Sequence, residues 1–152
     1  MPKKFESGDI FGVPLPDGSL ALGQFLSRER QALNSVGCAL FSATCPTTGP
    51  VPGELTPISA LLLTPDLLNK GIWPLLTKRE AIVPPEERPY EQFRDLGWVG
   101  ARAIGSGIIQ EFLAAYHKFC PWDDWYVPDY LDRLLLPGVP RPEGVVLCKG
   151  RG

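Results

Sequence analysis

Proline and glycine limit this chain to short secondary-structure elements. The sequence holds 17 prolines in 152 residues, whereas average composition predicts about 8. There are also 16 glycines. Proline removes a backbone donor and glycine destabilises helix interiors, so long helices are excluded from most of the chain. The prolines gather at 46–57, 84–89 and 121–142. We therefore expect β-strands joined by stiff surface loops, with helices only where these residues are sparse.

Composition and charge narrow the class of protein. With 44% hydrophobic and 21% charged residues, the chain resembles an average globular protein and not a disordered one. The length suits a single domain over residues 1–152. The net charge is −2, and a chain without a basic excess is a poor candidate for direct nucleic-acid binding. No apolar run approaches the roughly 20 residues of a membrane helix, and the start lacks the apolar region of a secretory signal.

The four cysteines favour a reducing compartment. They are Cys38, Cys45, Cys120 and Cys148, and no two have the C-x-x-C spacing of a zinc site. If residues 36–45 form one strand, Cys38 and Cys45 lie about 23 Å apart, which is beyond disulfide reach. We expect reduced thiols, a cytoplasmic location and no metal or cofactor.

Hydrophobic alternation predicts a β-rich region over residues 8–83. Two strands, 9–15 and 19–26, flank Pro16-Asp17-Gly18, a sequence typical of a hairpin turn. A third strand at 36–44 is apolar on both faces and is expected to be central. Further strands are expected at 58–64, 71–76 and 144–149, and a turn or single helical turn at 66–71.

A helical region is predicted over residues 106–136. A stripe at i, i+3, i+4 and i+7 begins at Ile109 and ends at Tyr116, with Ser106 as the expected N-cap. A second short helix is expected over 129–136. Together the patterns predict a mainly β (α+β) fold: a curved antiparallel sheet or small SH3-like barrel with two short C-terminal helices.

Sequence features of an enzyme are sparse. His117 is the only histidine, so any serine or cysteine mechanism would need it as the base. Its place near a helix end is equally typical of a structural residue. The glycines between Gly97 and Gly107 lack the Gly-Lys-Ser/Thr ending of a phosphate loop and indicate a packing turn. We expect no catalytic residue.

One segment, residues 119–132, combines four aspartates with five aromatic residues and no basic residue. Its aromatic side chains either cap the core while the aspartates cap helix ends, or form an acidic surface for a basic protein partner. Tyrosine and tryptophan are typical interface anchors, and carboxylates accelerate encounter with a positive partner. Both interpretations hold together if tryptophans point inward and aspartates outward. The candidate partner-binding residues are Trp122, Asp123, Asp124, Trp125, Tyr126, Asp129 and Asp132.

Two motifs resemble a known family. The opening Gly8-Asp9-Ile10-Phe11-Gly12-Val13-Pro14-Leu15-Pro16-Asp17-Gly18, and Gly71-Ile72-Trp73-Pro74-Leu75 after Leu61-Leu62-Leu63-Thr64, resemble the immunity protein 26 family of bacterial polymorphic toxin systems. Pro121-Trp122-Asp123-x-Trp125 looks like a C-terminal extension of some relatives. The resemblance covers roughly the first half of the chain. It implies a mostly β, non-enzymatic protein without a cofactor that neutralises a cognate toxin, often a nuclease.

Two other functions remain open at the level of sequence. A small barrel endoribonuclease of the toxin–antitoxin type also opens with Gly-Asp-Ile, and here Arg28 and Arg30 would be its phosphate-binding groups. Alternatively, Trp73, Trp98 and Trp122 would line a small-molecule pocket beneath the loops. The missing basic excess and the single histidine count against the enzyme.

Overall fold

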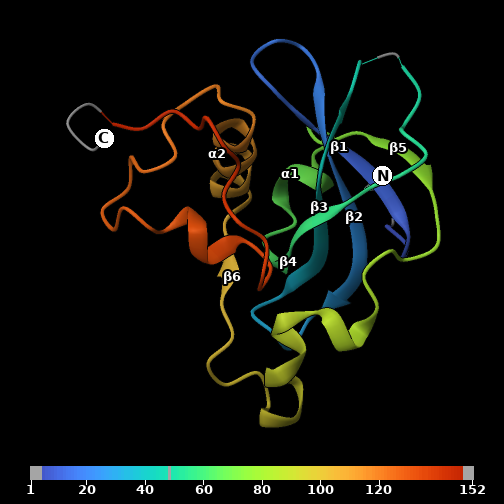
Figure 1. The fold of residues 1–152 in the computed structure, drawn as a ribbon. Coiled ribbons are helices and arrows are strands. Elements are labelled where there is room, and N and C mark those ends of the chain that lie inside the picture. Colours follow the sequence, from blue (N-terminus) through green and yellow to red (C-terminus); the bar gives the residue numbers. More distant parts are fainter. Residues whose placement is uncertain (1–4, 48, 149–152) are drawn as a thin grey trace.

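The fold is built on one six-stranded sheet with the strand order β5-β1-β2-β3-β4-β6 (Figure 1). The computed structural model describes residues 5–47 and 49–148. All neighbouring strands are antiparallel except β4 and β6, which are parallel. The sheet is not closed, so the open sheet and not the barrel is the observed form of the predicted mainly β fold. The strands are β1 (Asp9–Pro14), β2 (Leu20–Glu29), β3 (Ser35–Cys45), β4 (Pro57–Leu63), β5 (Leu75–Lys78) and β6 (Ala103–Ile104).

The predicted hairpin joins β1 and β2. Asp17 Oδ1 accepts hydrogen bonds from the backbone N–H and the hydroxyl of Ser19 at 3.0 and 2.6 Å. Gly18 has a φ of 88°, a conformation that glycine adopts without steric cost. The predicted face of the first strand is confirmed, because Phe11 and Val13 lie in the same core cluster and are fully buried.

The sheet carries a hydrophobic core on each face. The first core lies beneath α2 (Ser106–Tyr116) and takes in Phe25 and Cys38 from neighbouring strands. The second takes in Leu22 and Leu26 of β2 and Phe41 of β3. β3 pairs with both β2 and β4, as its two apolar faces predict.

α2 confirms the predicted helical stripe. Ile109, Phe112 and Leu113 are fully buried and Tyr116 is half-buried. Ser106 is not the N-cap, however, since Gly105 occupies that position. The Ser106 hydroxyl instead donates to Asp66 Oδ1 at 2.7 Å, and this bond fastens the helix to α1 (Asp66–Asn69).

Three expected elements differ from the structure. The predicted helix at 129–136 is only the 3-10 turn η3 (Leu131–Leu134). The predicted strand at 71–76 starts later, at Leu75, because the N–H groups of Ile72 and Trp73 donate to Leu67 O and close the turn after α1. The described part of the predicted strand at 144–149 is not a strand, and Lys149 lies outside the described residues. A backbone bond from Trp122 N–H to Val146 O at 2.7 Å and a bond from Cys148 N–H to Asp123 Oδ1 hold that segment in place of a ladder.

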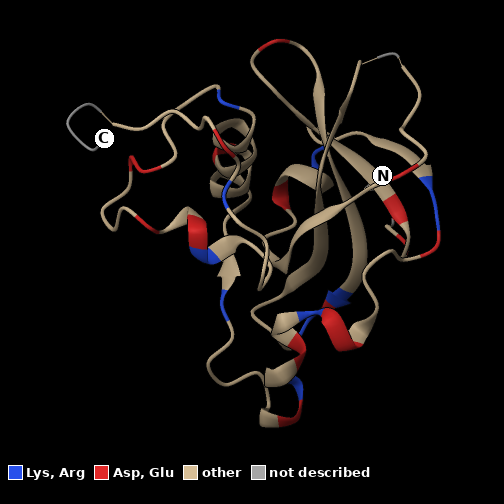
Figure 2. Cartoon of the chain, in the orientation of Figure 1, with Lys and Arg blue, Asp and Glu red and all other residues tan. Residues whose placement is uncertain are grey.

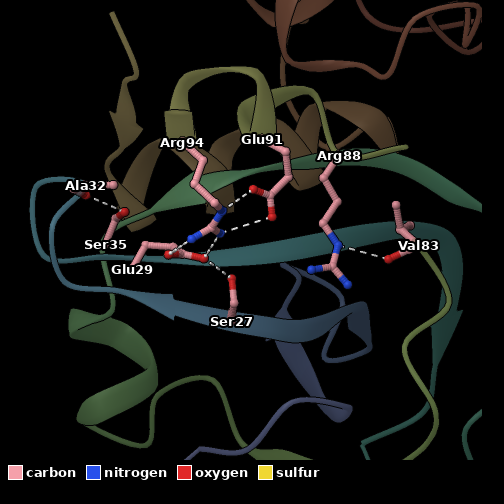
Figure 3. Close-up of polar contacts among 8 residues, drawn as sticks. All are labelled: Ser27, Glu29, Ala32, Ser35, Val83, Arg88, Glu91 and Arg94. Atoms are coloured by element: carbon pink, nitrogen blue, oxygen red, sulfur yellow. Dashed lines mark hydrogen bonds and ion pairs between the residues drawn. The ribbon is translucent and has the colours of Figure 1, made fainter. Parts of the chain in front are cut away.

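An unpredicted pair of 3-10 helices crosses the lower end of the sheet (Figure 1). They are η1 (Pro85–Glu87) and η2 (Pro89–Leu96). Arg94 of η2 donates to Glu29 of β2, with Nη2 and Oε2 2.6 Å apart, and to Glu91 (Figure 3). Ser27 donates to the same Glu29 carboxylate at 2.7 Å. This polar network attaches η2 to the strand ends.

Candidate protein-binding surface

Near its start, the acidic segment (residues 119–132) carries a tryptophan that belongs to the core. Trp122 is fully buried beside α2, with its ring centroid 5.7 Å from that of Phe112 and 6.4 Å from that of Tyr116. Its indole Nε1 donates to Asp132 Oδ1 at 3.2 Å. Trp122 therefore anchors the segment at its start and is inaccessible to a partner.

Asp123 is also internal. Its side chain is 5% exposed, and Oδ1 accepts a hydrogen bond from the backbone N–H of Cys148 at 2.7 Å. Together with the bond between Trp122 and Val146, this contact fixes the last described residues against the segment. Two of the seven candidate contact residues thus have structural positions.

The exposed candidate contact residues come after Asp123 in the sequence. Asp124 and Asp129 are exposed, and Tyr126 is fully so, at 103% relative exposure. Trp125 is half-buried and packs against Tyr130, with ring centroids 5.0 Å apart. The acidic stretches lie along the irregular chain between α2 and η3 (Figure 2).

A further carboxylate, Glu111 on α2, belongs to the same region. The Cys120 Sγ is 3.8 Å from the Glu111 carbonyl oxygen. Burial raises the pKa of the Cys120 thiol, and the negative charges of Glu111 and Asp124 raise it further. Both carboxylates therefore lie near Cys120. The sequence could have indicated Glu111, because its position falls outside the buried stripe of α2.

One cation borders the exposed carboxylates. Arg133 pairs with Asp129 one helical turn away, with Nη2 and Oδ1 3.2 Å apart. Asp132 is half-buried and faces Trp122. We define the acidic–aromatic surface as Glu111, Asp124, Tyr126 and Asp129, all of which are exposed.

His117 is a half-buried residue at the C-terminal end of α2. Its Nε2 is buried and has no hydrogen-bond partner in the structure. Burial lowers the pKa of the imidazole, and the Asp17 carboxylate opposes this shift. Ser19 lies two residues after Asp17, and its hydroxyl donates to the Asp17 carboxylate and not to the imidazole.

The arginines of the alternative endoribonuclease lie at the end of β2, on a different element from the acidic–aromatic surface. Arg28 and Arg30 are exposed at the end of β2 and the turn that follows it. The Arg28 guanidinium lies 5.8 Å from the centre of the Phe25 ring. The nearby Arg94 is neutralised by Glu29 and Glu91 (Figure 3).

The three tryptophans do not form one pocket. Trp73 and Trp122 are fully buried within the core under α2, and Trp73 stacks on Phe11 with ring centroids 5.5 Å apart. Trp98 lies in a separate cluster with Tyr90. The expectation of a pocket shared by these three side chains is wrong, because two of them fill the core.

Among residues 5–47 and 49–148, no three His, Cys, Asp or Glu side chains form a group able to hold a metal ion. No helix of that described part has the length and apolarity needed to cross a membrane. Comparisons with protein-family models, with curated proteins and with solved structures gave no match.

Proposed function

We propose that this protein binds a basic protein partner through the acidic–aromatic surface. The observation that carries the proposal is the full exposure of Tyr126 between the exposed carboxylates Asp124 and Asp129. Tyrosine is enriched among interface anchors because its ring supplies a large contact area and its hydroxyl can form a hydrogen bond. The buried Trp122 holds the segment to the core, which lowers the ordering cost of binding.

The resemblance to immunity protein 26 supports a specific partner, a cognate toxin domain. A nuclease toxin presents basic groups to nucleic-acid phosphates, and carboxylates at matching positions would occupy those groups and block the active site. On this proposal the protein acts in the cytoplasm of the producing cell, without catalysis and without a cofactor.

The first test concerns the partner. We expect the neighbouring gene to encode a secreted toxin with a nuclease domain, and we expect the purified protein to inhibit that domain in a nuclease assay. A neighbouring toxin domain that keeps full activity in the presence of excess protein would overturn the immunity role.

The second test concerns the surface. The variant Asp124→Asn with Asp129→Asn should lower the association rate for the toxin domain by roughly tenfold at low salt and flatten its salt dependence. The matched control is Glu86→Gln with Glu87→Gln, which removes two exposed charges on η1. Equal effects of the two double variants would place the interface elsewhere.

The endoribonuclease alternative predicts that the protein alone cleaves RNA, whereas the immunity role predicts no cleavage. We expect the protein alone to leave total RNA intact. Cleavage that disappears in the variant Arg28→Gln with Arg30→Gln would favour the enzyme over the immunity protein.

A further inference from the structure

A separate cleft lies at the β4 edge of the sheet. β6 pairs only with Leu62 and Leu63 of β4. Further along β4, the N–H of Leu136 donates to Ile58 O at 2.8 Å, and the Ser59 hydroxyl donates to Leu134 O. The edge between these two attachments opens into a cavity of about 360 Å³, within the size range of small-molecule sites.

The cleft is apolar inside. Its lining includes Ala60 of β4, Tyr90 and Phe93 of η2, Ile104 of β6 and Leu134 of η3. These residues come from four elements that are distant in sequence, so the cavity exists only in the folded chain. Apolar walls of this kind favour a ligand with a hydrocarbon or aromatic body.

The charged groups of the cleft are all positive. Arg102 and Arg133 line it, and no Asp or Glu is among its lining residues. The Arg133 guanidinium is already paired with Asp129. That of Arg102 forms no ion pair within the described part of the chain. The guanidinium is suited to carboxylates and sulfonates because it donates several hydrogen bonds in one plane.

We propose that this cleft binds a small amphiphilic anion, with its apolar body between β4 and η2 and its anionic group on Arg102. The cleft borders the acidic–aromatic surface at the Arg133–Asp129 ion pair but differs from that surface in charge and chemistry. The unpaired Arg102 guanidinium disfavours a basic protein partner in the cleft, whereas a small organic carboxylate or sulfonate satisfies both parts of the cleft.

The test uses two matched fluorescent probes on the intact protein. The sulfonate 1-anilinonaphthalene-8-sulfonate carries the proposed chemistry, and N-phenyl-1-naphthylamine is its neutral counterpart. We expect the sulfonate to bind one site per chain, and we expect its fluorescence to increase on binding. The variant Arg102→Gln should raise its dissociation constant roughly fivefold and leave binding of the neutral probe unchanged.

The control variant is Arg141→Gln, which removes an exposed arginine outside the cleft lining. It should leave the affinity for the sulfonate unchanged. An Arg102→Gln protein that binds the sulfonate as tightly as the parent, or a parallel loss in the Arg141→Gln control, would overturn the proposal. Because Arg102 is exposed, the variant should fold normally, and thermal unfolding checks this. The immunity assay described above is independent of either result.

Discussion

The indole of Trp122 donates a hydrogen bond to the carboxylate of Asp132 at 3.2 Å. This bond joins the two ends of the acidic segment, so a stretch without regular secondary structure is closed on itself and tied to the core. Tyr126 lies between these two ends and is fully exposed. One segment therefore contains both a core anchor and the centre of the proposed interface.

Trp122 and Tyr126 should respond oppositely to truncation. Trp122→Ala removes a fully buried indole and should lower the free energy of unfolding by about 3–5 kcal/mol. Tyr126→Ala should change it by less than about 0.5 kcal/mol, because exposed side chains contribute little to stability. Urea unfolding followed by circular dichroism measures both. A large loss of stability in Tyr126→Ala would mean that Tyr126 has a structural role.

Gly37 is expected to tolerate no side chain. A Cβ built at this position would overlap the Tyr90 hydroxyl and lie 2.9 Å from Tyr90 Cζ. Gly37→Ala should therefore displace η2 and lower the free energy of unfolding by about 1–3 kcal/mol. The additional change Tyr90→Phe removes the overlapping hydroxyl and should recover part of that loss. Additive effects of the two substitutions, measured in a double-mutant cycle, would contradict the contact.

The hydroxyl of Tyr90 should titrate late. Burial raises its pKa to about 12, and the other contributions to the shift are smaller. In an alkaline titration followed by phenolate absorbance, the Tyr90→Phe variant should therefore lack one tyrosine that ionises only at high pH. The late step would persist in Tyr90→Phe if another tyrosine were responsible.

His117 should make stability depend on pH below its ordinary pKa near 6.5. Burial lowers the pKa of the folded imidazole, so the unfolded chain binds a proton more readily than the folded chain. The free energy of unfolding should therefore be highest above pH 6.5 and fall as the pH drops below it. Urea unfolding at pH 7.5 and about pH 5.5 measures the change, which should shrink in His117→Gln. An identical pH dependence in the variant would assign the effect to other groups.

The pair of Glu29 and Arg94 should contribute more than an exposed ion pair. Glu29 is 7% exposed and its carboxylate accepts bonds from both Arg94 and Ser27. A double-mutant cycle of Glu29→Gln and Arg94→Gln should give a coupling energy of about 1 kcal/mol. The more exposed pair of Lys78 and Glu6 is the control and should couple less. Equal coupling in the two cycles would show that burial does not strengthen the bond.

The sequence predicted those elements whose pattern repeats locally. The alternation around Pro16-Asp17-Gly18 predicted the hairpin, and the period of Ile109, Phe112 and Tyr116 predicted α2 with its buried face. A two-residue strand such as β6 is too short to show a periodic pattern. It forms because it pairs with Leu62 and Leu63 at the edge of β4. η2 was missed for a similar reason, since Tyr90 and Arg94 attach it to Gly37 and Glu29 of the sheet, which are distant in sequence.

The candidate surface was predicted only in part. The aromatic and acidic composition of 119–132 located the region, but an irregular segment has no periodicity to separate inward from outward side chains. Trp122 and Asp123 are buried whereas Tyr126 is exposed, and no pattern in the sequence distinguishes them. Glu111 joined the surface through the position of α2 beside Cys120.

By itself, the sequence determined the β-rich class, the hairpin, the central strand and the amphipathic helix, because each depends on neighbours within a few residues. Only the tertiary structure decided that the sheet stays open, that Trp122 fills the core, and that a cleft with two arginines forms at the β4 edge. These features depend on contacts between distant residues, such as the 65 positions that separate Glu29 from Arg94. Such contacts depend on how the whole chain packs, and local composition does not specify them.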